Sequence, residues 1–197
     1  ISWQKFGKNS YGELSQISPD GRYVLTTGKS RSVFTPVQKM YYTKTFFPIK
    51  GVICVYDRKT DRYFELPGAD NPKYVQSNPV WSPDGKEILF TRADALNYKP
   101  AFETDKPVQS ENASLPFITG EKKIKYDICR IPFNGGRGGR AELVAGASRN
   151  GKSNFFPKYS PDGKWIVFCK AESMMSLQPD SRLFIIPAKG GEAREME

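Results

Sequence analysis

Tyr159–Phe168, with the sequence YSPDGKWIVF, is the clearest copy of a pattern that the chain contains three times. The other two copies are Trp81–Phe90 (WSPDGKEILF) and Ile17–Thr26 (ISPDGRYVLT). Proline fixes φ at the first central position of a turn, aspartate tolerates the second, and glycine supplies the left-handed residue before the return strand. A basic residue and a β-rich apolar run follow each glycine. The three copies therefore predict an internal repeat of tight turns and strands.

Each copy belongs to a longer unit in which four strand-like runs follow one another. Turn residues separate these runs, and the same order recurs after each Ser-Pro-Asp-Gly sequence. A further edge strand is expected at residues 1–7. The strands predicted for the three units are 13–17, 23–27, 51–57 and 62–66; 78–81, 87–91, 126–133 and 141–145; and 155–159, 165–170, 182–187 and 192–196.

These units resemble the repeats of TolB-type β-propellers, which are relatives of the WD-repeat propellers. The resemblance implies an all-β fold of three four-stranded antiparallel blades. Since three blades do not close a ring, we expect part of a larger propeller of about six to eight blades. One partial propeller domain then spans residues 1–197. Its expected divisions are blade 1 at about 8–66 with an insertion at 28–50, blade 2 at about 67–145 with an insertion at 92–125, and blade 3 at about 146–197.

The long connections are predicted to lie on one face of the propeller. Strands of an antiparallel meander alternate in direction, so the insertions at 28–50 and 92–125 share a face with the loops at 67–77 and 146–154. The Ser-Pro-Asp-Gly turns are on the opposite face. Loops held by a rigid scaffold commonly carry binding residues. We therefore expect a ligand on the long-loop face, at the candidate residues Arg31, Lys39, Tyr41, Tyr42, Lys44, Tyr74, Arg149 and Lys152.

The first insertion combines aromatic and basic residues and contains no acidic residue. Aromatic side chains offer flat contact surfaces and cations attract anions, a mixture that suits a sugar, an acidic peptide or a single-stranded nucleic acid. The alternative is an extra hairpin whose aromatic side chains pack on the propeller. Both interpretations remain open.

Composition excludes several kinds of chemistry. The 197 residues include no histidine, which rules out Ser-His-Asp and Cys-His catalysis and His-containing metal sites within this chain. The net charge of +9 favours an acidic partner or an anionic surface, although a basic solvated surface is the simpler interpretation and no nucleic-acid partner is expected. Cys54, Cys129 and Cys169 form no C-x-x-C pair, and we expect them to be small buried hydrophobic residues.

Two patterns imitate functional motifs. Residues 146–153 (GASRNGKS) match the P-loop pattern, but a P-loop precedes a helix, whereas Pro157 and Pro161 oppose a helix here. Nucleotide binding is therefore only a remote alternative. Asp20, Asp84 and Asp162 occupy separate turns, so we expect them to be spread around a rim without converging on a metal.

The functional expectation is a non-catalytic binding module without a cofactor or a metal. By resemblance, it belongs to the bacterial periplasm or outer envelope and binds a protein or glycan partner. The alternative is the substrate-gating propeller of a serine peptidase whose catalytic domain lies outside this sequence. No apolar run is long enough to span a membrane. Because the chain begins at Ile1 without a signal peptide, we expect it to be processed or cut from a longer chain.

Overall fold

A computed structural model describes residues 13–37, 40–95, 121, 124–172 and 180–197, and for residues 13, 31–37 and 40–47 it describes the backbone alone. The regular secondary structure of this part of the chain consists of β-strands, apart from one 3-10 turn, η3, at Asn134–Gly136. None of its helical segments is long and apolar enough to cross a membrane. The all-β prediction is therefore confirmed. The predicted strand at residues 1–7 lies outside the described residues.

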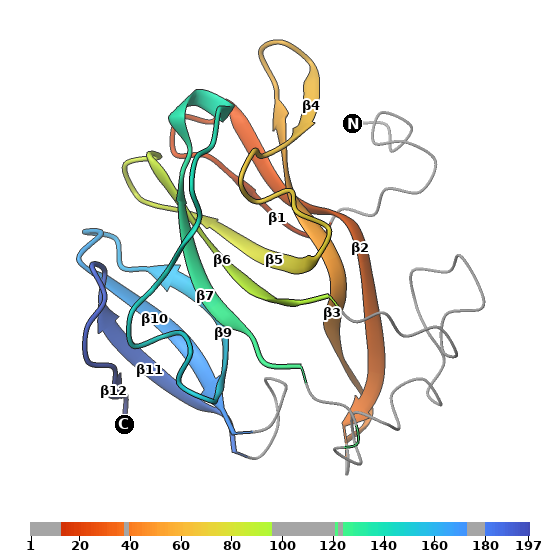
Figure 1. Cartoon of the computed structure of the whole chain (residues 1–197), viewed down its shortest axis with the longest axis vertical. Helices are drawn as coiled ribbons and strands as arrows, with labels where there is room; N and C mark the ends of the chain where they lie inside the picture. The colour runs from red at the N-terminus through yellow and green to blue at the C-terminus, as the bar shows by residue number, and fades with distance from the viewer. Residues whose placement is uncertain (1–12, 38–39, 96–120, 122–123, 173–179) are drawn as a thin grey trace.

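The strands occur in three successive units (Figure 1). The first unit has β1 (Glu13–Ile17), β2 (Tyr23–Val37), β3 (Met40–Asp57) and β4 (Arg62–Glu65). The second has β5 (Tyr74–Trp81), β6 (Glu87–Asp94), β7 (Asp127–Pro132) and β8 (Glu142–Leu143). The third has β9 (Ser153–Tyr159), β10 (Trp165–Ala171), β11 (Arg182–Pro187) and β12 (Arg194–Glu195).

Neighbouring strands within each unit pair in antiparallel fashion. The third unit forms a separate four-stranded sheet. The first two units are joined into one eight-stranded sheet, because Gly51 of β3 and Val75 of β5 form a parallel bridge. The expected three separate sheets are therefore seen only in part, and the number of blades stays a prediction.

Apolar side chains from successive units form cores between the units. Leu25 and Ile53 of the first unit pack with Ile88 and Phe90 of the second. A second core joins the second unit to the third through residues that include Leu89 and Ile166. Because each sheet is covered by the next, the units form a stack in which burial of apolar area supplies the main stabilising term.

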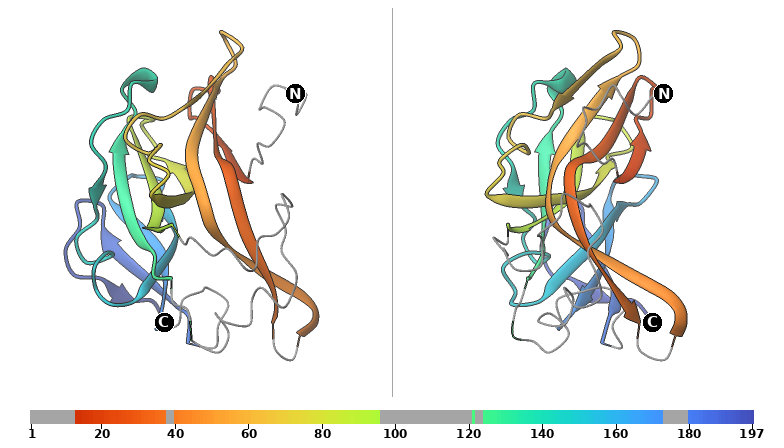
Figure 2. Two further views of the ribbon diagram at one scale, coloured as in Figure 1. Left: turned by 45° about the vertical axis from the view of Figure 1, so that its right-hand side comes forward. Right: turned by 90° about the vertical axis from the view of Figure 1, so that its right-hand side faces the viewer.

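The first insertion forms a long β-hairpin arm. β2 and β3 remain paired from Tyr23–Asp57 out to Val37–Met40, with irregular register at Gly28–Ser32. Figure 2 shows these two strands continuing past the ends of their neighbours. The described part of the insertion at 28–50 therefore forms an extra hairpin, one of the two expected possibilities, and the ladder satisfies its backbone polar groups. Whether its aromatic side chains pack on the propeller stays a prediction. The second insertion, at 92–125, lies mostly outside the described residues.

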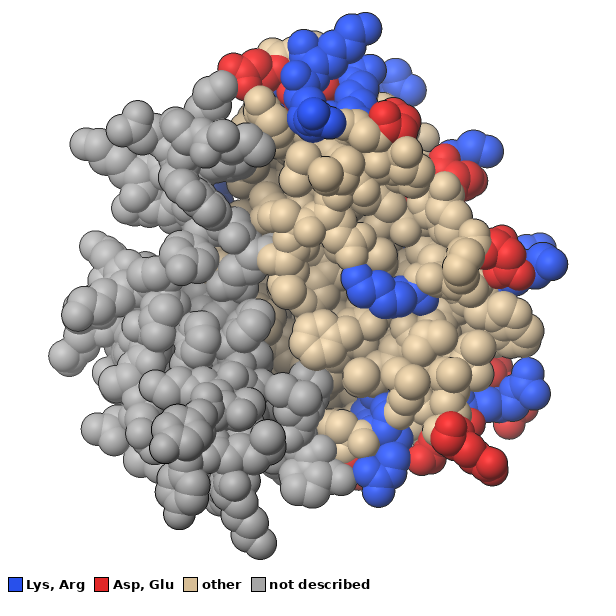
Figure 3. All heavy atoms as spheres, turned by 180° about the vertical axis from the view of Figure 1, so that it is seen from behind, with Lys and Arg blue, Asp and Glu red and all other residues tan. Residues whose placement is uncertain are grey.

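Charged side chains are unevenly distributed on the surface. On the described part of the face opposite to the view of Figure 1, the middle is mostly uncharged apart from a basic side chain, and the other acidic and basic side chains gather toward the upper, right-hand and lower edges (Figure 3). The innermost strands β1, β5 and β9 lie side by side, since β1 contacts β5 and β5 contacts β9. These three strands carry the concave surface described below.

Candidate functional site

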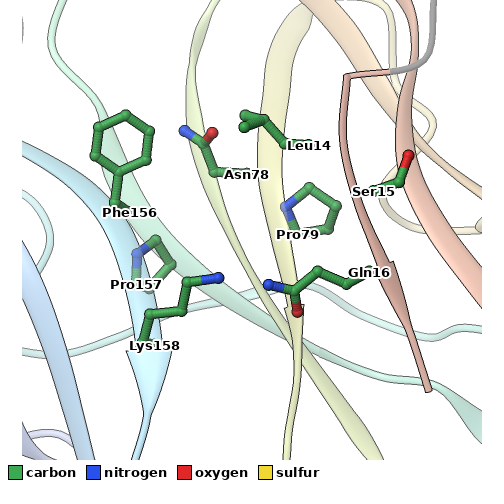
Figure 4. A pocket seen from close by; sticks show the side chains of 8 residues that line it. All are labelled: Leu14, Ser15, Gln16, Asn78, Pro79, Phe156, Pro157 and Lys158. Atoms are coloured by element: carbon green, nitrogen blue, oxygen red, sulfur yellow. The ribbon is translucent and has the colours of Figure 1, made fainter.

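A hollow of about 160 Å³ lies between the three inner strands (Figure 4). We call it the inner hollow. Each unit contributes an equivalent part of β1, β5 or β9, which begins four residues before the serine of the next Ser-Pro-Asp-Gly turn. The lining residues are Leu14, Ser15, Gln16, Asn78, Pro79, Phe156, Pro157 and Lys158.

A backbone irregularity explains how these side chains reach the hollow. Leu14, Asn78 and Phe156 occupy equivalent positions and have φ values of 55°, 53° and 48°. Each inner strand also shifts register against its neighbour at this point. A β-bulge redirects a side chain, and a left-handed non-glycine residue costs about 1–3 kcal/mol. The same costly bulge in three units points to a shared structural purpose at the hollow.

Asn78 is the buried polar residue of the hollow, with 8% of its surface exposed. Its Nδ2 donates to Thr91 Oγ1 at 3.2 Å, and this hydroxyl in turn donates to the Ser77 carbonyl. Asn78 Oδ1 has no partner among the described residues, which leaves an acceptor unsatisfied. Across the hollow, partial burial lowers the pKa of Lys158. The hollow therefore combines an amide acceptor, a cation and the apolar side chains of Leu14 and Phe156.

Most of the predicted ligand residues of the first insertion lie on the arm. Arg31 is on β2, where its backbone pairs with Lys50, and Tyr41, Tyr42 and Lys44 are on β3. The described part of these residues is the backbone, and Lys39 lies outside the described residues. Whether their side chains form one surface with the other candidates stays a prediction.

The remaining candidates lie at one end of the sheets, where β5, β7 and β9 begin and β6 and β10 end; we call this the loop end. The Arg92 guanidinium stacks over the Tyr74 ring, 4.8 Å from its centroid. The backbone N–H of Arg149 donates to Asp127 Oδ1 at 2.8 Å, while the Arg149 side chain is exposed. Lys152 forms an ion pair with Glu172.

Asp127 is the titratable carboxylate at the centre of this loop end. Burial raises its pKa, and the Arg149 N–H and the nearby Arg92 charge oppose that rise. Arg92 and Asp127 are also direct cross-strand partners on β6 and β7. The arrangement leaves Arg149 as an exposed cation suited to an acidic partner.

The P-loop look-alike at 146–153 has the wrong structural context for phosphate binding. The strand β9, and not a helix, begins at Ser153, as the prolines predicted. Two backbone N–H groups of the loop at 146–153 already have acceptors. The Arg149 N–H donates to Asp127 Oδ1, and the Lys152 N–H donates to Asn150 Oδ1 at 3.1 Å. The loop therefore lacks the cradle that a P-loop offers to phosphates.

The turns of neighbouring units lie next to one another along the stack. A Cβ atom placed on Gly85 would lie 3.6 Å from Pro19 Cδ, and one on Gly163 would lie 3.7 Å from Pro83 Cδ. The turn carboxylates are nevertheless used within their own turns, and no group of three acidic or cysteine residues that could hold a metal occurs in the described ranges.

The cysteines have unfavourable surroundings for thiolate chemistry. All three are free thiols; Cys54 and Cys129 are buried and Cys169 is half-buried. Burial raises the pKa of Cys54 to about 11 and that of Cys129 to about 12. This agrees with the prediction of small buried hydrophobic residues.

No protein-family model matches the chain. Its fold is similar to TolB from Agrobacterium tumefaciens, with a TM-score of 0.57 over 96% of this chain and 50% of that one, at 20% sequence identity. It is also similar to a prolyl endopeptidase, with a TM-score of 0.53 over 95% of this chain and 22% of that one, at 14% identity. These likenesses show a TolB-like β-propeller fold.

In sequence, the chain is similar to the uncharacterized peptidase YuxL of Bacillus subtilis. The two are 29% identical over 108 residues, which cover 48% of this chain and 15% of the peptidase. The chain therefore spans a small part of this curated relative and at most half of the two structures above. Both TolB and peptidases are thus among the proteins that it resembles.

Proposed function

We propose that the chain is a non-catalytic binding module of the bacterial cell envelope, which binds a protein or glycan partner through its long-loop face. The TolB-like fold supports this role, since propellers present loops on a rigid scaffold. At the loop end, Arg149 offers an exposed cation and Tyr74 a stacked aromatic ring. The inner hollow adds a recess with both polar and apolar lining.

One observation supports the non-catalytic part of the proposal: histidine is absent from the 197 residues. These residues therefore offer no imidazole base for a serine or a cysteine. The thiols of Cys54 and Cys129 have raised pKa values, so they are protonated at neutral pH. The Asp127 carboxylate already accepts the Arg149 N–H and faces Arg92, an arrangement that stabilises the loop end.

A fluorophosphonate probe tests this point, because it labels activated serine nucleophiles covalently. We expect the 197-residue chain to remain unlabelled after incubation at pH 7–8, while a serine peptidase in the same experiment is labelled. Stoichiometric labelling of the folded chain, lost after heat denaturation, would refute the non-catalytic assignment.

A second candidate function is the substrate-gating propeller of a serine peptidase. The 29% identity to a Bacillus subtilis peptidase over 108 residues favours it. Both candidates require the propeller to bind without doing chemistry, so they differ in what accompanies it. The coding sequence discriminates between them: a following α/β-hydrolase region with a G-x-S-x-G elbow supports the peptidase, and a secretory or lipoprotein signal supports the envelope module.

A further inference from the structure

Asn78 is the buried polar side chain at the centre of the inner hollow. It lies on β5 of the second unit, and β5 contacts the inner strands β1 and β9 of the first and third units. Figure 4 shows its amide between Leu14 and Phe156, which belong to these two flanking strands. Asn78 is 8% exposed. Its burial is therefore produced by contacts within the described chain, with one unit on each side.

Hydrogen bonds fix which end of the Asn78 amide is left without a partner. The Thr91 hydroxyl donates its single hydrogen to the Ser77 carbonyl at 3.0 Å, so toward Asn78 it can only accept. It accepts from Asn78 Nδ2 at 3.2 Å. The other amide atom, Oδ1, is buried and has no partner among the described residues. The hollow therefore contains an acceptor that is satisfied by an N–H or O–H group from outside this network.

The backbone does not by itself require an asparagine at this position. Asn78 has a φ of 53°, a left-handed conformation that asparagine tolerates. Leu14 and Phe156 adopt the same conformation at the equivalent positions, with φ values of 55° and 48°. Since apolar residues form the same bulge, the backbone does not account for the polar side chain of Asn78. Its unsatisfied acceptor is the feature that distinguishes the second unit at this position.

The hollow also contains a cation. The Lys158 side chain extends from β9 toward the earlier units, and the Gln16 side chain extends toward it from β1 (Figure 4). Burial lowers the pKa of Lys158, and no carboxylate of the described residues offsets this effect. An ammonium group without an acidic neighbour attracts an anion. The lining therefore suits a ligand that has both a negative charge and a hydrogen-bond donor.

The size and the apolar walls of the hollow narrow the class of ligand. Its volume of about 160 Å³ is close to that of a cavity that holds a benzene-sized group, of about 150 Å³. Half of its lining residues are leucine, phenylalanine or proline. A sugar acid carries hydroxyl groups on every side, and such walls leave them without partners. The last residue of a peptide instead combines one carboxylate, one backbone N–H and one side chain.

We propose that the inner hollow binds the C-terminal residue of a peptide whose last side chain is apolar. The backbone N–H of that residue donates to Asn78 Oδ1, and its carboxylate accepts from the Lys158 ammonium. Its side chain packs between Leu14 and Phe156, whose rotamers change to admit it, as interface side chains commonly do. This assignment rests on the binding role proposed above, but it concerns the inner strands and not the loop end.

Saturation-transfer NMR titrations of the intact protein with short peptides test the ligand class. The probe is acetyl-Gly-Ser-Gly-Leu with a free carboxylate, and we expect a Kd of about 0.1–1 mM. Amidation of the last carboxyl group and N-methylation of the last peptide bond should each weaken binding at least about tenfold, because each removes one of the two polar contacts. Equal affinities of the free acid and the amide would overturn the proposal. So would displacement of the peptide by an equal concentration of glucuronate.

Substitutions assign the two contacts to their residues. Lys158→Gln should weaken binding of the free acid at least about tenfold and leave binding of the amide unchanged. Asn78→Leu, which introduces the residue that the first unit has at this position, should weaken binding of the N–H peptide but not of the N-methylated one. The control, Lys164→Gln, removes an equal charge from an exposed turn and should leave binding unchanged. Circular dichroism verifies that each variant is folded.

Two results contradict the site in different ways. If Lys158→Gln and Lys164→Gln weaken binding of the free acid equally, net charge and not the hollow attracts the peptide. If the intact protein binds none of the peptides while a partner binds at the loop end, this inference is wrong and the proposed function stands.

Discussion

In each Ser-Pro-Asp-Gly turn, one serine hydroxyl joins the two ends of the turn. Ser82 Oγ donates to Asp84 Oδ1 at 2.7 Å and accepts from the Glu87 N–H at 2.9 Å. Asp84 Oδ1 also accepts from the Lys86 N–H. The turns of the first and third units contain the same three bonds. The repeat therefore preserves a hydrogen-bond arrangement as well as a turn shape.

Ser82→Ala should lower the free energy of unfolding by about 1–2 kcal/mol, because it removes the acceptor of a backbone N–H at a buried position. Urea denaturation monitored by tryptophan fluorescence measures the change. Lys59→Ala, at an exposed turn position, is the control and should stay within about 0.5 kcal/mol of the wild type. Equal effects of the two substitutions would contradict the role given to the hydroxyl.

The Arg22–Asp57 pair predicts a loss of stability in acid. Arg22 Nε and Nη2 donate to the two Asp57 oxygens at 3.1 and 2.7 Å, and this pairing holds the pKa of Asp57 well below its usual 3.8. Because the unfolded chain binds the proton more readily, the stabilisation is present above about pH 4 and is lost as the pH falls. Urea denaturation between pH 2 and 6 should give a flatter pH dependence for Asp57→Asn than for the wild type. Parallel curves for the two proteins would refute this assignment.

At the scale of elements, strands with a clear apolar run were predicted well. The bounds of β1 and β11 agree with the predicted 13–17 and 182–187, because turn residues flank both runs. The extension of β2 and β3 as a hairpin was only one of two possibilities, since Lys29–Arg31 and the prolines at 36 and 48 interrupt the strand pattern. Hydrogen bonds between two paired strands stabilise such segments, although neither segment has a strong β-strand propensity alone.

The structural role of the glycines between units was not predicted either. This role arises from contacts between segments that are far apart in the sequence. The Gly139 N–H donates to the Pro67 carbonyl, and the Gly191 N–H donates to the Ala145 carbonyl. Gly68 and Gly146 follow these two carbonyls at equivalent positions of the first and second units. Their close approach to the next unit fixes how one sheet follows another.

Gly146→Ala tests this close approach against a matched control in the same loop. Its Cβ would lie 1.9 Å from the Gly191 carbonyl oxygen at a φ of +86°, so we expect a loss of at least about 3 kcal/mol of stability. Gly151 has a similar φ of +73° with nothing within 4 Å, and Gly151→Ala should cost only about 1–2 kcal/mol. Thermal and urea unfolding provide the comparison, and similar costs would argue against a tight junction.

At the scale of the whole molecule, the sequence predicted the repeat but not the inner hollow. Tyr74, Arg149 and Lys152 lie at the loop end, and their role in binding stays a prediction. The bulges at Leu14, Asn78 and Phe156 have no common residue type, so nothing in the sequence marked them. Only their equal separation in sequence from the turns, four residues before each turn serine, could have revealed them.

The central claim is that the chain binds a partner at its loop end, and paired charge reversals test it most directly. Binding to an array of acidic peptides and cell-wall oligosaccharides is measured for the wild type, Arg149→Glu at the loop end and Lys86→Glu at the turn end. Both side chains are exposed, so both variants should remain folded. We predict affinity at least about tenfold weaker for Arg149→Glu, unchanged for Lys86→Glu, and decreasing for the wild type as salt rises. A wild-type chain that captures nothing on the array, or a loss confined to Lys86→Glu, would contradict the account.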